Sequence, residues 1–171
     1  MTIPAIDQAL KMKASHAPLW EIAFLLCNEP FALAGGCLVT DPPNDYDVYP
    51  MSMHAKAFDR VSIKAGLECL KKTHDCAVLF ESRNALTVCV DGKHIQFCDY
   101  VVTSPSVPDK PSLVKLVRSF DYTHVQVGVS FTPTEDDKGS ISTPEVDLVY
   151  YTADYLETLI TKQTKYSGTE F

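Results

Sequence analysis

A glycine pair followed closely by two alternating aspartates limits the fold of this chain more than any other feature. Apolar residues 31–33 precede Gly35-Gly36, and the run Asp45-Tyr46-Asp47-Val48-Tyr49 has the composition of a second strand. Residues i and i+2 of a strand share a face, so we expect Asp45 and Asp47 to point the same way. The stretch therefore predicts two strands joined by a tight connection, with both carboxylates on one side of the second strand.

The residue types in this stretch indicate a site for a divalent cation and a phosphate. Two neighbouring carboxylates repel each other unless a cation lies between them. Mg²⁺ suits such a pair because it is a hard ion that binds carboxylate and phosphate oxygens together. A glycine pair allows the backbone to approach a phosphate closely, since no side chain stands in the way.

Hydrophobic periodicity elsewhere predicts a mixture of helices and strands. Asp91-Gly92 joins two alternating runs and is a strong hairpin signal, and Ser112 is suited to the N-cap of a short helix. Helices are expected at residues 4–14, 18–27, 55–72, 112–118 and 153–162. Strands are expected at residues 31–33, 45–49, 76–81, 85–90, 94–102, 120–131 and 145–152, with loops at 104–111 and 132–143. We predict an α+β fold in which helices flank a mixed, mainly antiparallel sheet, as a single domain over residues 1–171.

Composition and charge argue against several classes of function. The 171 residues are enough for one domain with a sizeable core. A formal net charge of −7 argues against a strongly basic nucleic-acid surface, although a local basic patch stays open. The chain contains no run of about 18 apolar residues, which a membrane-spanning helix would need. Residues 1–14 do not resemble a signal peptide. The six cysteines contain no CxxC pair that would predict a zinc site, and they fit buried, reduced thiols in a cytoplasmic protein.

Two segments resemble a known family. The glycine pair and Asn44-Asp45-Tyr46-Asp47-Val48-Tyr49 resemble the active-site pattern of the DNA polymerase beta-like nucleotidyltransferase superfamily, in which two glycines or Gly-Ser precede Asp-x-Asp. Residues 117–124 (VRSFDYTH) resemble the Phe-Asp-Phe segment of small phage and viral nucleotidyltransferase-like proteins, and more loosely the Arg-Arg-Asp-Phe-Thr segment of tRNA nucleotidyltransferases and bacterial poly(A) polymerases. Ile95-Gln96-Phe97 also fits the small phage group. The resemblance covers a catalytic core of about residues 30 to 131.

The resemblance implies a metal-dependent nucleotidyl transfer. Asp45 and Asp47 would hold two Mg²⁺ ions that bridge the phosphates of a nucleoside triphosphate such as ATP. Gly35, Gly36 and Cys37 would line the triphosphate through backbone N–H groups. The reaction would move a nucleoside monophosphate to a hydroxyl acceptor, for which an RNA end, a protein hydroxyl and a small molecule all stay open.

A third carboxylate and the glycine turn distinguish two hypotheses. Asp121, in the Phe-Asp-Tyr segment, is the first choice as the third catalytic and metal-binding carboxylate; Asp99 is the second, and Asp147 is a remote third. Cys37 stands where the family often has Ser, and a thiol is only a weak donor. The alternative to an enzyme is therefore a catalytically impaired nucleotidyltransferase fold that acts as a nucleotide-binding or regulatory module.

Overall fold

A computed structural model describes residues 3–15, 18–26, 29–40, 43, 45–51, 56–103, 112–135, 137–139 and 141–166. It confirms the predicted α+β class. The helices are α1 (Pro4–Ser15), α2 (Pro18–Leu26), α3 (Arg60–Leu70), α4 (Leu113–Arg118) and α5 (Ala153–Thr161), with 3₁₀ turns η1 (Gly35–Leu38) and η2 (Thr123–Val125). The strands are β1 (Phe31–Ala34), β2 (Asp45–Pro50), β3 (Cys76–Glu81), β4 (Ala85–Val90), β5 (Lys93–Cys98), β6 (Val127–Glu135) and β7 (Ile141–Tyr151).

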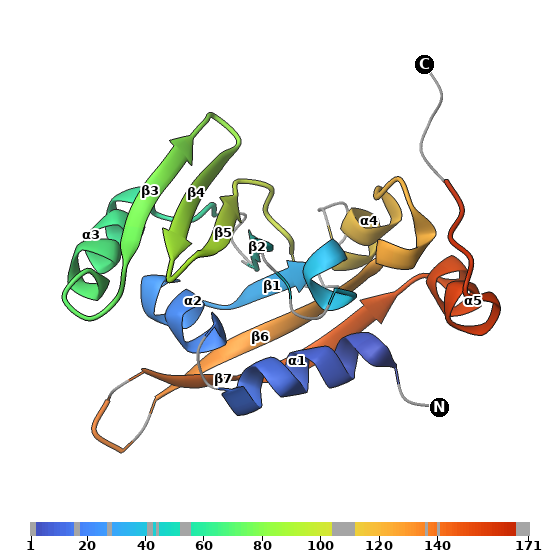
Figure 1. Cartoon of the computed structure of the whole chain (residues 1–171), viewed down its shortest axis with the longest axis horizontal. Helices are drawn as coiled ribbons and strands as arrows, with labels where there is room; N and C mark the ends of the chain where they lie inside the picture. The colour runs from blue at the N-terminus through green and yellow to red at the C-terminus, as the bar shows by residue number, and fades with distance from the viewer. Residues whose placement is uncertain are drawn as a thin grey trace.

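Strand β2 lies in the middle of a seven-stranded sheet with the order β3-β4-β5-β2-β1-β6-β7. It pairs antiparallel with β1 and parallel with β5, and the other neighbouring strands pair antiparallel. The sheet is therefore mixed and mainly antiparallel, as predicted. Figure 1 shows α3 beside β3 at one end of the sheet and α5 at the opposite end.

The two faces of the sheet have separate hydrophobic cores. On one face, Tyr46 and Val48 of β2 pack in a large core with residues of α1, α2 and α3. On the other face, Tyr49 packs with a smaller cluster that includes three residues of α4. Figure 1 shows α1 and α4 on opposite sides of β1 and β6. Because side chains alternate along β2, Asp45 and Asp47 lie on the α4 side, which the helices cover less completely.

Local signals predicted most element ends correctly. The β4–β5 turn has positive φ at both Asp91 (50°) and Gly92 (82°), the backbone of a type I′ hairpin. Ser112 caps α4, since its hydroxyl accepts from the Lys115 N–H at 3.3 Å. The helix predicted at 55–72 begins later, at Arg60, because the Asp59 side chain accepts from the N–H groups of the first turn. The predicted loop at 104–111 lies outside the described residues.

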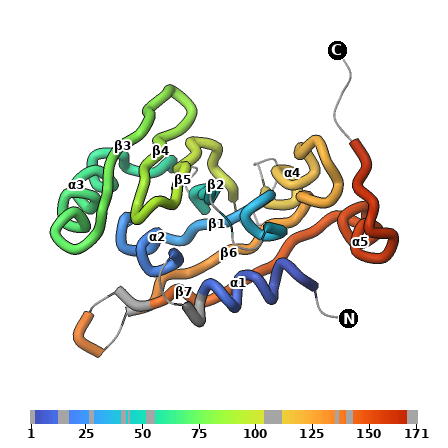
Figure 2. The backbone as a smooth tube through the Cα atoms, in the orientation of Figure 1, coloured from blue at the N-terminus to red at the C-terminus, as the bar shows by residue number. Residues whose placement is uncertain are grey.

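The prediction at residues 120–143 was wrong in two places. The strand predicted at 120–131 begins only at Val127, because Gln126 donates from its side chain to the Phe120 carbonyl at 3.1 Å and so stabilises a turn before the strand. The loop predicted at 132–143 is a hairpin, since β6 continues to Glu135 and β7 begins at Ile141. Pro133 lies where the register shifts, so its missing N–H is tolerated. Figure 2 shows the two strands running side by side.

The cysteines are less uniform than predicted. Cys37 and Cys76 are buried, whereas Cys89 and Cys98 are partly buried and Cys69 is exposed. Cys69 lies next to Glu68 on the outer side of α3, which explains why an apolar sequence environment gave the wrong prediction. These five described cysteines form no disulfide with one another, and Cys27 lies outside the described residues.

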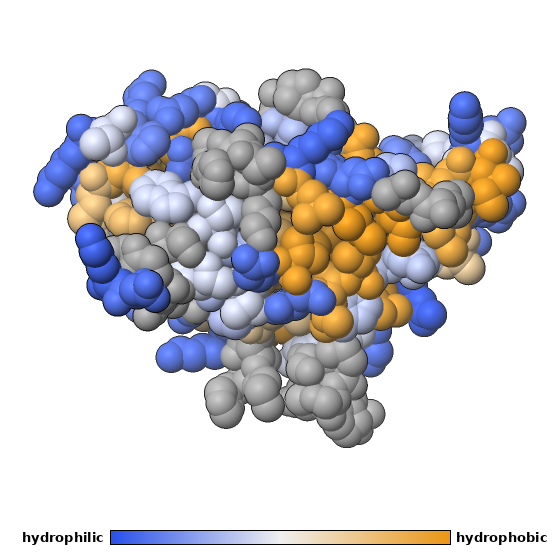
Figure 3. Space-filling view, turned by 90° about the horizontal axis from the view of Figure 1, so that it is seen from below, coloured by the Kyte–Doolittle hydropathy of each residue, from blue (hydrophilic) through white to orange (hydrophobic). Residues whose placement is uncertain are grey.

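Helices α1 and α5 present hydrophobic surface as well as core. Figure 3 shows hydrophobic residues gathered on the lower side of the molecule, over these two helices. Leu10 of α1 and Ile160 of α5 are 49% and 72% exposed. Within the described part of the chain, every helix is too short or too polar to cross a bilayer.

The β4–β5 turn provides a test of the fold. Gly92→Ala places a side chain on left-handed backbone, and we expect the free energy of unfolding to fall by about 1 kcal/mol. Urea denaturation measures the change. Gly36→Ala is the matched control, because Gly36 is outside the left-handed region and an added Cβ there meets no atom within 4 Å. Equal effects of the two substitutions would contradict the assigned turn.

Candidate functional site

The structure brings the two aspartates of β2 to one open hollow. Asp45 and Asp47 line a cavity of about 290 Å³ together with Gly36, Cys37 and Thr40 of the glycine turn. Pro43 completes the lining. The alternation predicted from the sequence is therefore confirmed: both carboxylates face the hollow, and Tyr46 between them is buried on the other face.

The two carboxylates differ in their surroundings. The Asp45 side chain is 75% exposed, whereas Asp47 is half-buried. Burial and the negative charge of Asp45 both raise the pKa of Asp47 above its usual value. A cation between the two groups would offset both effects, so this donor set of carboxylate oxygens fits a hard divalent ion.

Strand β5 adds two side chains, His94 and Gln96, to the face that contains Asp45 and Asp47. In the parallel register, Asp45 pairs with His94 and Asp47 with Gln96, so these four residues share a face. The His94 Nδ1 lies 3.2 Å from Asp45 Oδ1. Gln96 belongs to the Ile95-Gln96-Phe97 segment that fits the small phage group, but the sequence analysis did not single out His94. Its alternation with Gln96 was a signal, yet only the pairing of β2 with β5 places it beside Asp45.

The glycine turn has one structural and one open glycine. Gly35 is buried with φ 83°, and a Cβ there would lie 3.5 Å from the Phe120 ring. Gly36 is exposed, lines the hollow, and has free space where a Cβ would be. Of the predicted triphosphate residues, Gly36 and Cys37 therefore reach the hollow, and Gly35 instead shapes the turn behind it.

The Cys37 thiol is protonated at neutral pH. Burial, and then the nearby charge of Asp47, raise the pKa of Cys37 to about 12. The thiol lies 3.9 Å from the carbonyl oxygen of Ala34, to which it donates. Cys37 therefore behaves as a small buried side chain, and any contact that it makes with a phosphate would come from its backbone.

None of the three candidates for the third carboxylate is among the residues that line the hollow. Asp121 is exposed and follows Phe120, whose ring lies against Gly35, so it lies near the turn but outside the cavity lining. Asp99 accepts from Arg60 at 2.7 Å, an interaction that fixes it just beyond the end of β5. Asp147 accepts from the Thr132 hydroxyl on the β6–β7 hairpin. The role of Asp121 stays a prediction.

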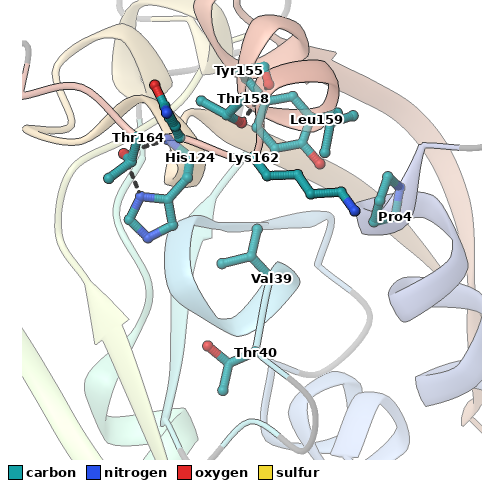
Figure 4. A pocket seen from close by; sticks show the side chains of 10 residues that line it. Pro4, Val39, Thr40, His124, Tyr155, Thr158, Leu159, Lys162 and Thr164 are labelled. Carbon is teal, nitrogen blue, oxygen red and sulfur yellow. Dashed lines mark hydrogen bonds between the residues drawn. The ribbon is translucent and has the colours of Figure 1, made fainter.

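A second, larger cavity lies next to the hollow. It measures about 520 Å³ and is bounded by the start of α1, the end of the glycine turn, η2 and α5. Thr40 lines both cavities. In Figure 4, His124 and Thr164 stand on one side and Lys162 reaches across toward Pro4. The His124 Nδ1 lies 2.7 Å from the Thr164 hydroxyl, which orients the imidazole at the cavity wall.

A local basic patch, which the net charge left open, could draw on two cations of α4. Lys115 and Arg118 are exposed in its last turn, which favours cations through the helix dipole. Neither is among the residues that line the two cavities.

The sequence matches no protein-family model, and no curated protein matches it at a significant level.

Burial of Asp47, together with repulsion from Asp45, predicts a pH-dependent stability. When folding raises the pKa of a carboxyl, the free energy of unfolding falls as the pH rises from the unfolded pKa to the folded pKa. Asp47 therefore destabilises the metal-free protein at neutral pH. Asp47→Asn should therefore raise the free energy of unfolding at pH 7 in EDTA, with the gain fading as the pH falls below the usual range of an aspartate. Urea denaturation at several pH values measures it.

The matched control for this experiment is Asp137→Asn, which removes the same charge from an exposed turn. It should leave the pH profile unchanged. Added Mg²⁺ should stabilise the wild type more than Asp47→Asn. If Asp47→Asn is less stable than the wild type at pH 7 without metal, the predicted cost of the buried Asp47 charge is contradicted.

Proposed function

We propose that this protein is a Mg²⁺-dependent nucleotidyltransferase that moves a nucleoside monophosphate from a nucleoside triphosphate to a hydroxyl group. The observation behind the proposal is that Asp45 and Asp47 face one hollow that is also lined by an open glycine, Gly36. Carboxylates and exposed backbone are the two parts that a metal-bound triphosphate needs.

Each residue of the hollow has a distinct part in the proposal. Asp45 and Asp47 would hold Mg²⁺, which when bound neutralises phosphate charge and favours an ionised acceptor hydroxyl. The open backbone at Gly36 gives a phosphate chain room to lie close to the turn. His94 and Gln96 border the same face and offer hydrogen bonds to the substrate. The protein thus contributes positioning and charge stabilisation, which dominate phosphoryl-type transfers.

The larger cavity is the proposed place for the rest of the substrate. It adjoins the hollow at Thr40, and its volume of about 520 Å³ falls in the range of small-molecule sites. Leu159 and Tyr155 offer apolar surface, and His124 and Lys162 offer polar groups at the rim. A nucleoside or a small acceptor placed there would lie beside the hollow at Thr40.

A second function is favoured by a specific observation. On β5, the two positions that face Asp45 and Asp47 are His94 and Gln96, and neither supplies a third carboxylate. Together with the protonated Cys37 in the turn, this favours a protein that binds a metal-bound nucleotide without turning it over. The two functions share the hollow and differ only in whether label is transferred.

Transfer of label from an α-labelled nucleoside triphosphate tests the enzyme. With Mg²⁺ and a panel of RNA ends, proteins and small alcohols, we expect incorporation by the wild type and a loss of at least about 100-fold in Asp45→Asn/Asp47→Asn, because the metal contributes several kcal/mol to the transition state. Asp121→Asn in the same assay tests the third carboxylate. Equal incorporation by the wild type and the double variant would reject the proposal.

Mg²⁺-dependent nucleotide binding separates the two functions without knowledge of the acceptor. Calorimetry should show binding by the wild type that requires Mg²⁺ and disappears in the double variant. Binding without any transfer would favour the regulatory module. No difference between the wild type and the double variant would contradict both functions.

The open glycine gives a finer prediction. Gly36→Val should leave the fold intact, because the position has no positive φ and free space around a Cβ, but its side chain should project into the hollow. We expect nucleotide affinity to fall about 10-fold, a loss of about 1.4 kcal/mol. Val61→Ile, exposed on α3 and outside the lining of both cavities, is the matched control for added volume. Unchanged affinity in Gly36→Val would remove Gly36 from the binding site.

A further inference from the structure

A second cluster of metal-binding side chains lies away from the hollow. Glu21 of α2, His74 after α3 and Asp91 of the β4–β5 turn each direct one ligand atom to a common point, and these three atoms lie within 4.8 Å of one another. Helix α2 packs on the face of the sheet opposite to Asp45 and Asp47. The cluster is thus separate from the proposed catalytic site.

The geometry of the cluster centres on one nitrogen. The His74 Nδ1 lies 2.6 Å from Asp91 Oδ2 and 3.6 Å from Glu21 Oε1. The other Asp91 oxygen accepts from the Asp75 N–H at 3.0 Å, so this carboxylate is held in place by backbone. The Glu21 side chain is only 7% exposed, whereas Asp91 is at the surface.

The buried Glu21 carboxylate has no hydrogen-bond donor within the cluster. Nδ1 has at most one hydrogen, and the short contact to Asp91 takes it. Glu21 lies beyond hydrogen-bond distance of that nitrogen, and among the described residues no group donates a hydrogen bond to it. Burial accordingly raises the pKa of Glu21. His74 and Lys93 offset part of the charge of Glu21, but a buried carboxylate without a hydrogen bond is costly, so a further positive charge at this point would stabilise the fold.

We propose that Glu21, His74 and Asp91 bind a Zn²⁺ ion. The ion would take the place of the Nδ1 hydrogen, which leaves to solvent as a proton, and would bond to one oxygen of each carboxylate, with water as the remaining ligand. An imidazole nitrogen with two carboxylates favours a borderline ion such as Zn²⁺ over Mg²⁺, which prefers oxygen alone. The Asp75 N–H supplies the outer contact that orients a metal-binding carboxylate.

Such a site would join three parts of the chain that meet only in the fold. It links α2, the end of α3 and the β4–β5 hairpin, so the ion would act mainly on stability. An ion that binds the folded chain alone stabilises it in proportion to the logarithm of its concentration over Kd. This inference does not rest on the proposed nucleotidyl transfer, and the two can fail separately.

Zinc titration of the full chain tests the site. Equilibrium dialysis should find one Zn²⁺ per chain with a Kd of about 1 µM or lower, and the melting temperature should rise with zinc concentration. His74→Gln should weaken binding about 100-fold or more and abolish the thermal shift. His94→Gln distinguishes the cluster from the hollow, since it removes the histidine beside Asp45, and it should bind zinc as the wild type does.

Two further measurements keep the proposal falsifiable. Glu21→Gln keeps the shape of the buried side chain and should weaken zinc binding while circular dichroism shows an intact fold. Co²⁺ bound by the wild type should give visible absorption that is absent in His74→Gln. The proposal is overturned if the wild type binds no zinc, or if His74→Gln binds zinc as tightly as the wild type. Cys76→Ser changes the buried thiol near Glu21 and Asp91. Loss of zinc binding in this variant alone would also overturn the proposal.

Discussion

The alternation of side chains along β2 is the constraint on which the candidate site depends. Tyr46 and Val48 are 1% and 0% exposed and anchor one face of the central strand in the larger core. Asp45 and Asp47 must then lie on the opposite face, beside the hollow. A shift of one residue in register would expose both apolar side chains and bury both carboxylates, so the cost of that shift holds the carboxylates where they are.

The same sheet places two unlike groups of cation ligands on its two sides. The hollow offers carboxylate oxygens and open backbone, which suit a hard ion together with phosphate. Each group has an imidazole beside a carboxylate, but the Glu21 carboxylate is nearly inaccessible to water, whereas Asp45 of the hollow is largely exposed. Open backbone at Gly36 is a property of the hollow, and each group has excess negative charge that an ion would relieve.

Sequence reasoning succeeded where the cause of a structure is local. The Asp91-Gly92 turn, the Ser112 cap and the shared face of the two aspartates each depend on a few neighbouring residues. It failed where partners lie far apart in the chain. Nothing near His94 indicates that β5 pairs parallel with β2, and Asp99 is held by an arginine 39 residues away. The same limit applies to Gln126, whose side chain bonds define where β6 begins.

The fold requires a glycine at one of the two positions of the turn but not at the other. Gly35 has φ 83° and packs against Phe120, so the fold alone accounts for a glycine at this position. Gly36 has neither property: its backbone is one that any residue adopts, and a Cβ would meet only open space. Gly36 lines the same hollow as Asp45 and Asp47. The fold therefore does not require a glycine at this position, and under the proposed function a phosphate lying against the turn would account for it.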